Sequence, residues 1–337
     1  MSTSIWTAFE QQAWQLDQRF AGGYRSGCFD YLQPTRLQPQ VPARLRRPYA
    51  TPVFYADWGP LDAPLLVCIG GVANTAMRFN FLAADLQERF RVVCMDWLGR
   101  GRSGWLADDS EYTRATYVEQ LRQLIAHLGR RRLSLLGSSM GGSVALELAA
   151  DLPQRIERLV LNDVGPSIPA ARRRRRADTL ARFYVFRSPE ELARRIGAAQ
   201  KNDGPISDEI RLFLAWHQTR WSDENGGRVY RHDPRALLAY RREAQESRLD
   251  QWALWQRIRC PVLLLHGMQS DALTPAIIAR MGRSPLVDLS VAHIPDTGHT
   301  PLLSDRNQTH CIADWLQGRG SPGECSVPLA APRTVWR

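Results

Sequence analysis

Short apolar segments alternate with stretches of helical periodicity along most of the chain, and this alternation constrains the fold more than any other feature. Strand-like runs occupy residues 53–58, 64–69, 91–97, 133–136 and 156–163, and helical patterns occupy residues 78–90, 113–128 and 140–151. Strands that alternate with helices form βαβ units, in which helices cover both faces of a parallel sheet. We therefore predict an α/β protein with a mostly parallel central sheet.

The alternation is interrupted once, after Gly165 and Pro166. Residues 167–255 have a helical pattern with many arginines and aromatic residues. The alternation then resumes with a strand at 261–266, a helix at 275–281, a strand at 287–294 and a helix at 305–316. Ligands bind at the carboxyl edge of a parallel sheet, and an insertion that leaves this edge lies over them. The sequence predicts an inserted α-helical cap at 167–255 and a core formed by residues 51–166 and 256–318.

Both ends of the chain differ from this core. Residues 1–50 are predicted to be an N-terminal extension that begins with an amphipathic helix. The apolar positions of this helix recur at three- and four-residue steps and are Trp6, Phe9, Ala13, Leu16 and Phe20. A connector rich in proline and arginine follows over residues 33–52. Residues 319–337, rich in proline and glycine, are predicted to be a disordered tail.

The composition narrows the environment and the partners. The 337 residues include 44 basic and 34 acidic ones, a net charge of +10, yet Lys201 is the only lysine. Such a skew fits a bias of genome composition better than a phosphate-binding face, so we expect no nucleic-acid partner and keep DNA binding as a minor alternative. We expect no membrane span and no secretory signal. Six cysteines without metal spacing or paired pattern favour a reducing, cytoplasmic location.

The strongest local signal is the segment GSSMGG at residues 137–142, which contains the pattern G-x-S-x-G with Ser139 at its centre. An apolar strand precedes the segment and a helix-forming stretch follows it. A strand-to-helix turn of this kind is strained and exposes the serine hydroxyl at the sheet edge. The backbone N–H of Met140 would face the same space near a helix N-terminus, where negative charge is stabilised. Ser139 is therefore the candidate nucleophile.

A serine hydroxyl needs a base, and the base needs an orienting acid. Among seven histidines, His299 lies in a turn-rich loop after the strand at 287–294, at the same sheet edge as Ser139. We expect it to be the base. Asp271 follows the strand at 261–266 and is the favoured acid. Asp163, at the end of the strand at 156–163, is the competing position.

The order Ser139, Asp271, His299 resembles that of the α/β-hydrolase family, in its serine-nucleophile members with a helical cap. Two further segments carry the resemblance. DWLGRGRS at 96–103 is similar to the family turn D-x-R-G-H-G-x-S, and LVLNDVGP at 159–166 is similar to the segment that precedes the cap. The resemblance implies a second oxyanion donor in the segment IGGV at 69–72, where Gly70 replaces the usual histidine. By position this donor is the N–H of Val72, beside that of Met140.

The resemblance implies acyl transfer from a small-molecule ester to water, without metal or organic cofactor. The leading hypothesis is a carboxylic ester hydrolase for small or medium acyl groups, including hydroxyalkanoate-type esters. A C–C bond hydrolase of vinylogous diketones and a non-catalytic binding protein of the same fold stay open, as does a homodimer.

Substrate contacts are expected from the loop, the elbow and the cap, at Gly71, Ser138 and Trp216. Residues 172–176 are five consecutive arginines. They are interpreted either as a solvated helix face or as a site that attracts a carboxylate-bearing substrate.

Overall fold

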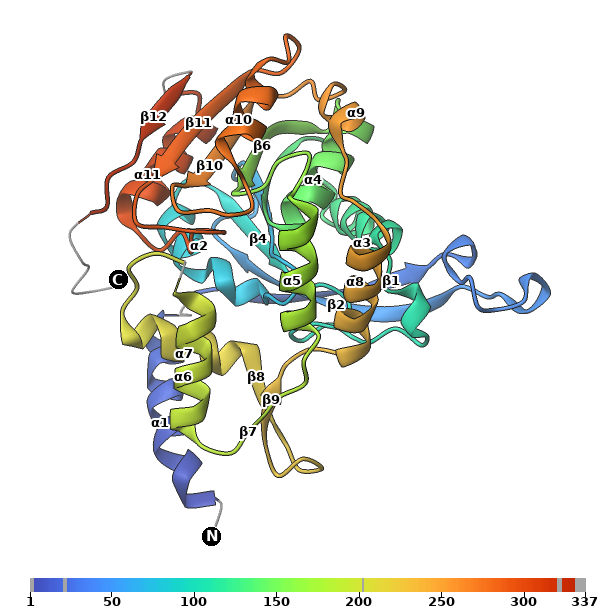
Figure 1. Cartoon of the computed structure of the whole chain (residues 1–337), viewed down its shortest axis with the longest axis vertical. Helices are drawn as coiled ribbons and strands as arrows, with labels where there is room; N and C mark the ends of the chain where they lie inside the picture. Colours follow the sequence, from blue (N-terminus) through green and yellow to red (C-terminus); the bar gives the residue numbers. More distant parts are fainter. Residues whose placement is uncertain (1–2, 21–22, 202, 320–322, 331–337) are drawn as a thin grey trace.

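A nine-stranded sheet forms the centre of the computed structural model, which describes residues 3–20, 23–201, 203–319 and 323–330 (Figure 1). Its strands, in spatial order, are β1 (Arg25–Gln33), β2 (Tyr49–Trp58), β4 (Arg91–Met95), β3 (Leu65–Ile69), β5 (Leu133–Ser138), β6 (Ile156–Asn162), β10 (Val262–Gly267), β11 (Leu289–Ile294) and β12 (Glu324–Ser326). From β4 to β12 all neighbours pair in parallel, and β2 pairs antiparallel with both β1 and β4. The prediction of a mostly parallel central sheet is confirmed.

Helices cover both faces of this sheet, as the continuously apolar strands require. On one face pack α3 (Arg114–His127), α4 (Met140–Asp151), α9 (Trp252–Trp255) and α10 (Pro275–Gly282). On the other face pack α2 (Asn80–Leu86) and α11 (Arg306–Leu316), together with the short 3₁₀ helix Ala76–Phe79. All five residues of β3 are buried, which explains why its sequence shows no apolar–polar alternation. The sheet therefore separates two apolar cores.

Most of the segment between β6 and β10 forms the cap, which contains a small sheet as well as helices. Its helices are α5 (Ala170–Leu180), α6 (Pro189–Gln200), α7 (Asp208–Gln218) and α8 (Pro234–Glu246). Its antiparallel strands are β7 (Val185–Phe186), β9 (Gly227–Tyr230) and β8 (Thr219–Ser222), in that spatial order. The predicted insertion is mainly helical, and its small sheet was not predicted. The physical reason for the sheet is a hairpin turn through Gly226, whose φ of +59° suits glycine.

The N-terminal segment contributes to both parts of the molecule. Helix α1 (Thr3–Phe20) buries the five predicted apolar positions and packs against α6 and α7 of the cap, as Figure 1 shows. Strand β1 then joins the central sheet, so residues 25–33 belong to the core architecture. The predicted connector at 33–52 ends earlier than expected, because β2 already begins at Tyr49. Sheet edges pair by backbone contacts, which apolar periodicity does not reveal.

The C-terminal segment departs from the predicted disordered tail where the structure describes it. Strand β12 pairs with β11 in parallel and extends the sheet by one strand. Residues 320–322 and 331–337, to which the same prediction applied, lie outside the described residues. Among the helices in the described part of the chain, none combines the length and apolar character that crossing a membrane requires.

Candidate active site

The turn between β5 and α4 places Ser139 at the carboxyl edge of the sheet. Ser139 has a φ of +51°, a conformation that L-residues seldom adopt and that marks a strained turn. The flanking glycines are required by close backbone approach. A Cβ at Gly137 would lie 2.4 Å from the Cα of Gly142, and one at Gly141 would lie 2.3 Å from the carbonyl oxygen of Ile69. The glycine spacing thus lets the strand turn directly into the helix.

Ser139, His299 and Asp163 form a continuous hydrogen-bonded chain. His299 Nε2 lies 3.0 Å from Ser139 Oγ, and His299 Nδ1 lies 2.9 Å from Asp163 Oδ2. These residues follow β5, β11 and β6, so three strand ends meet at one place. The structure therefore brings together the predicted nucleophile and base, with the alternative acid position rather than the favoured one.

The structure corrects the preference for Asp271 as the acid. Its carboxylate pairs with Arg172 of the cap helix α5 at 2.9 Å, and its side chain is 63% exposed. Burial raises the pKa of the Asp271 carboxyl, but the hydrogen bond and charge of Arg172 and the charge of His299 outweigh this effect and hold it below its ordinary value. Asp271 thus lies at the cavity rim and links cap to core.

Asp163 is positioned by the core itself. Its side chain is fully buried and its φ is +53°, which turns the carboxylate back toward β10. Asp163 Oδ1 accepts a hydrogen bond from the Gly267 N–H at 3.0 Å, and Oδ2 accepts one from the Ser270 hydroxyl at 2.5 Å. The sequence carried one usable signal for this role, namely a polar residue directly after a buried strand. It did not reveal that β6 lies between β5 and β10 in the sheet.

The loop after β3 runs past the nucleophile. A Cβ at Gly71 would lie 3.5 Å from the Cβ of Ser139. The Gly71 N–H donates to Asn74 Oδ1 at 2.9 Å, and the Trp97 indole donates to the carbonyl of Gly70 at 2.8 Å. These two side chains, which the sequence analysis missed, hold the loop where the family has a histidine.

The predicted oxyanion donors are the backbone N–H groups of Val72 and Met140. The Val72 N–H has no hydrogen-bond acceptor among the described residues, while the Val72 carbonyl accepts from Arg100 Nε at 2.9 Å. The Met140 N–H opens α4, where the first N–H groups lack intrahelical acceptors. Val72 and Met140 line cavities that both reach Ser139. That both N–H groups donate to an oxyanion stays a prediction.

The surroundings of His299 favour its neutral form. Burial lowers the pKa of the His299 imidazole, and the charges of Arg172 and Arg176 lower it further. The hydrogen bond and charge of Asp163 act in the opposite direction without cancelling the shift. A neutral imidazole hydrogen-bonded to a serine can accept the hydroxyl proton, so the site can perform base-assisted nucleophilic attack.

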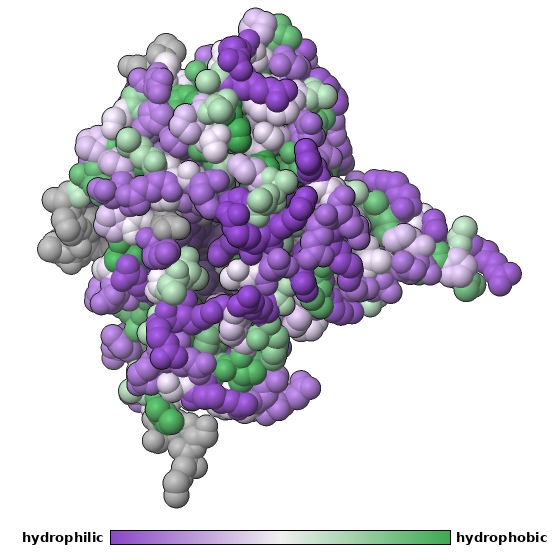
Figure 2. Space-filling model, in the orientation of Figure 1, coloured by the Kyte–Doolittle hydropathy of each residue, from purple (hydrophilic) through white to green (hydrophobic). Residues whose placement is uncertain are grey.

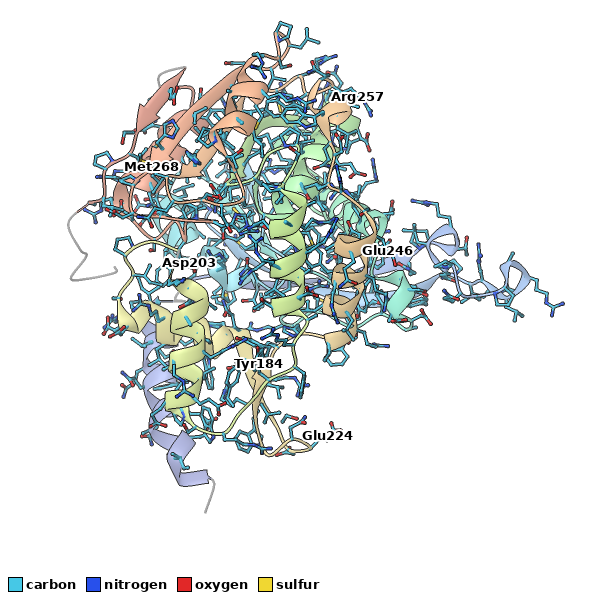
Figure 3. The ribbon with its side chains drawn as sticks, in the orientation of Figure 1. Tyr184, Asp203, Glu224, Glu246, Arg257 and Met268 are labelled. Atoms are coloured by element: carbon cyan, nitrogen blue, oxygen red, sulfur yellow. The ribbon has the colours of Figure 1, made fainter. Side chains whose placement is uncertain are left out.

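A cavity of about 480 Å³ opens at Ser139 and His299, between the core and the cap. Figure 3 labels two of the cap residues that line it, Tyr184 before β7 and Asp203 after α6.

The three residues predicted to contact the substrate lie in different places. Gly71 lines the cavity. Ser138 is buried beneath the turn, where its hydroxyl accepts a hydrogen bond from Asn162, and is therefore corrected as a substrate contact.

Trp216 is also corrected as a substrate contact. Its ring lies 6.3 Å from that of Phe9 on α1, and the guanidinium of Arg228 lies 4.8 Å from it. Trp216 thus belongs to the contact between α1 and the cap.

Within the described ranges, no group of three or more His, Cys, Asp and Glu side chains is arranged to hold a metal ion.

Comparison with known proteins assigns the fold to a family. The family model of the alpha/beta hydrolase fold matches residues 63–305. The chain is 32% identical over 287 residues to a 3-hydroxybutyrate-oligomer hydrolase of Cupriavidus necator, covering 82% of this chain and 95% of the relative. It is 30% identical over 270 residues to a pimeloyl-[acyl-carrier protein] methyl ester esterase of Nitrosomonas europaea, covering 76% and 96%.

Solved structures agree with this assignment at the level of the fold. A Rickettsia typhi protein described as a hydrolase superposes with a TM-score of 0.78 at 22% identity, covering 87% of this chain and 99% of that one. An alpha/beta hydrolase of Novosphingobium aromaticivorans superposes with a TM-score of 0.72 at 24% identity, covering 87% and 98%. The fold and the family match define a capped α/β protein of the hydrolase class. The chain belongs to the α/β-hydrolase family, and the prediction that it is a hydrolase is confirmed.

Proposed function

We propose that the protein hydrolyses carboxylic esters through an acyl-enzyme intermediate on Ser139. The observation that carries this proposal is the chain of contacts from Ser139 Oγ to His299 Nε2 at 3.0 Å and from His299 Nδ1 to Asp163 at 2.9 Å. Nucleophile, base and orienting acid in hydrogen-bond contact are the arrangement that activates a serine hydroxyl.

The reaction follows from these contacts in two halves. His299 accepts the Ser139 proton as the oxygen attacks the ester carbonyl, and the N–H groups of Val72 and Met140 donate to the developing oxyanion. The imidazolium then protonates the leaving alcohol, which leaves the acyl group on Ser139. Water, deprotonated by His299, attacks the acyl carbon and releases the acid. Asp163 keeps the Nδ1–H directed toward itself throughout, which leaves Nε2 free to accept protons.

Hydroxyalkanoate-type esters are the substrate class that we favour. A relative that shares 32% identity over most of both chains is named a 3-hydroxybutyrate-oligomer hydrolase. The main cavity, at about 480 Å³, has the size of small-molecule sites. A second cavity of about 270 Å³ lies beside it and shares the lining residues Tyr184, Tyr230 and His232.

The test is a hydrolysis panel with a Ser139→Ala control. The panel contains p-nitrophenyl esters of graded acyl length, linear 3-hydroxybutyrate oligomers, a lactone, a thioester and a vinylogous diketone. We expect turnover of esters, labelling of Ser139 by a fluorophosphonate probe and loss of both in Ser139→Ala, since the nucleophile is gone. Cleavage of the diketone without cleavage of any ester would favour the C–C hydrolase alternative. Ester turnover that survives in Ser139→Ala would refute the proposal.

Three further expectations stay predictions: a cytoplasmic location, a homodimer as an alternative to a monomer, and the absence of a nucleic-acid partner.

A further inference from the structure

The cavity above Ser139 carries a surplus of positive charge. Its lining includes six arginines, namely Arg78, Arg172, Arg175, Arg176, Arg182 and Arg195, against the two carboxylates of Asp203 and Asp271. If the two carboxylates are each set against one arginine, four positive charges remain. Figure 2 shows that the surface over α5, which supplies three of these arginines, is strongly hydrophilic. Such a lining favours an anionic ligand over a neutral one.

Three of the arginines have partners within the protein. Arg78 pairs with Asp203 at 2.9 Å and donates to the carbonyl of Thr300 at 2.7 Å. Arg172 pairs with Asp271 at 2.9 Å. The guanidinium of Arg195 lies 3.7 Å from the ring centroid of Tyr184. These three side chains build the wall of the cavity, and their charges are partly satisfied.

Arg176 differs from the others. It is partly buried, and none of the described residues accepts a hydrogen bond from it or forms an ion pair with it. Burial lowers the pKa of the Arg176 guanidinium, and the charge of Arg172 adds to this effect. Arg175 and Arg182, by contrast, are exposed to solvent, which can solvate them. Arg176 is thus a desolvated cation directed at a cavity, a costly arrangement unless an anion arrives.

Gln200, at the end of α6, supplies a second and independent observation. Its side chain is 4% exposed and lines the same cavity. Its Nε2 and Oε1 atoms are both buried without a hydrogen-bond partner among the described residues. Buried amide groups are nearly always hydrogen-bonded, so two unsatisfied amide atoms on a residue that lines a cavity point to a ligand that would enter beside them.

We propose that Arg176, together with Gln200, binds the free carboxylate of the ester substrate, so that the enzyme selects esters that carry a carboxylate over neutral ones. The inference rests on the proposed ester hydrolase function and adds the chemical class of the substrate. A guanidinium binds a carboxylate with two parallel N–H···O bonds, and the Gln200 Nε2 can donate a third. A linear hydroxyalkanoate oligomer with a free acid end has this chemistry.

A substrate carboxylate bound to Arg176 would also raise the pKa of His299. His299 is surrounded by Ser139, Asp163, Arg172, Arg176 and Asp271, and the two arginines disfavour its imidazolium form. A carboxylate bound to Arg176 offsets one of these positive charges. The enzyme–substrate complex of an acidic ester should therefore have its acid limb of kcat at higher pH than the complex of a neutral ester.

The experiment compares kcat/KM for cleavage of the internal ester bond in the linear 3-hydroxybutyrate dimer with kcat/KM for cleavage of the same bond in its methyl ester, in which a methyl group removes the carboxylate charge. The variants are Arg176→Gln, Arg176→Lys and the matched control Arg174→Gln, an exposed arginine of the same helix outside the cavity lining. We expect Arg176→Gln to lower the acid-to-ester ratio roughly 10- to 100-fold, the range for charge-assisted hydrogen bonds. Arg176→Lys should restore part of it, and Arg174→Gln should keep the wild-type ratio.

The outcomes separate this inference from the proposed function. A wild-type enzyme that hydrolyses the methyl ester as well as the acid, or an unchanged ratio in Arg176→Gln, overturns the inference and leaves ester hydrolysis intact. An equal fall of the ratio in Arg174→Gln overturns it as well, because the effect would then be general charge. A wild-type enzyme that hydrolyses no ester and takes up no fluorophosphonate overturns the proposed function. If Arg176→Gln has a lowered melting temperature, two other measurements test the inference. They are the acid-to-ester ratio of Arg176→Lys and the acid limbs of kcat for the two substrates of the wild-type enzyme.

Discussion

Two aspartates lie near His299, and only one of them contacts it. Asp163 is buried, with three donors directed at its carboxylate. Asp271 is largely exposed and pairs with Arg172 across the cap boundary. The same substitution at the two positions therefore separates an orienting role from an ion pair at the cavity rim.

We predict that Asp163→Asn lowers kcat about 100- to 10,000-fold, because the amide no longer fixes the imidazole with Nδ1 protonated. Asp271→Asn should change kcat by less than about threefold, since the largely exposed Asp271 carboxylate pairs with Arg172 and not with His299. Steady-state kinetics on one ester, with thermal melting to verify folding, makes the comparison. The reverse pattern would show that Asp271 is the acid after all.

The pKa of His299 predicts the position of the acid limb of the rate profile. His299 accepts a proton only when neutral, so activity is present above its pKa and is lost as the pH falls through that value. Burial and two arginines hold the pKa of His299 below the ordinary 6.5. The lower limb of kcat/KM for a neutral ester should lie below pH 6.5, and Arg172→Gln should move it upward. A limb above pH 6.5 in the wild type would contradict the prediction.

At the scale of single residues, the sequence predicted the serine and the histidine that the structure brings into contact, but not their surroundings. Ser139 was predictable because a glycine-flanked serine between strand and helix is a local pattern. The contact between Asp163 and His299 was not, since it depends on which strands are neighbours in the sheet. Gln200 and Arg176 acquire their importance only from the cap fold, which brings α5 and α6 over the core.

Helix α1 connects the cap to the core. Phe20 contacts Phe213 of α7, with ring centroids 5.8 Å apart, and Phe81 of α2, with centroids 5.4 Å apart. The core side chain Asn80 donates to the Phe20 carbonyl at 2.9 Å. One helix of the N-terminal extension thus fixes the position of two cap helices relative to the sheet.

We predict that Phe20→Ala destabilises the cap, since truncating a buried phenylalanine costs about 3–5 kcal/mol. The expected results are a lower melting temperature, faster proteolysis within residues 189–218 and a higher KM for the ester. Trp14→Ala is the matched control, because this aromatic side chain of the same helix is 59% exposed. Equal effects of the two substitutions would argue against α1 as the link between cap and core.

Elements of the core were predictable where apolar periodicity is strong. The helix over residues 140–151 and the strands near 64–69 and 261–266 agree with the structure within one residue. The cap strands β7 to β9 were missed because they have only two to four residues, too short to show a period. Strands β1 and β12 were missed because edge pairing depends on the partner strand more than on their own sequence.

The net charge of +10 is not spread evenly over the molecule. Several arginines form ion pairs on the surface that neutralise their charge, such as Arg114 with Glu147 and Arg241 with Asp178. The cap helix α5, in contrast, contributes arginines without an ion-pair partner among the described residues to the cavity at Ser139. The electrostatic character that matters for function is therefore local.

We predict that added salt lowers kcat/KM for an acidic ester much more than for its methyl ester, because screening weakens the attraction of the cavity for an anion. Stopped-flow or steady-state rates from low to about 0.5 M sodium chloride measure the effect, given a Debye length of roughly 10 Å at 0.1 M. Equal salt dependence of the two esters would contradict a cavity that attracts carboxylates.

The arginine-lined cavity also bears on what happens after the bond is broken. On the proposed function, hydrolysis of an uncharged ester group creates a new carboxylate inside a space that already holds more cations than anions. The product therefore binds more tightly than the group from which it came. On this reasoning, we expect the accumulating acid to compete with fresh substrate for the cavity. A cavity built to capture an anion makes its own product an inhibitor.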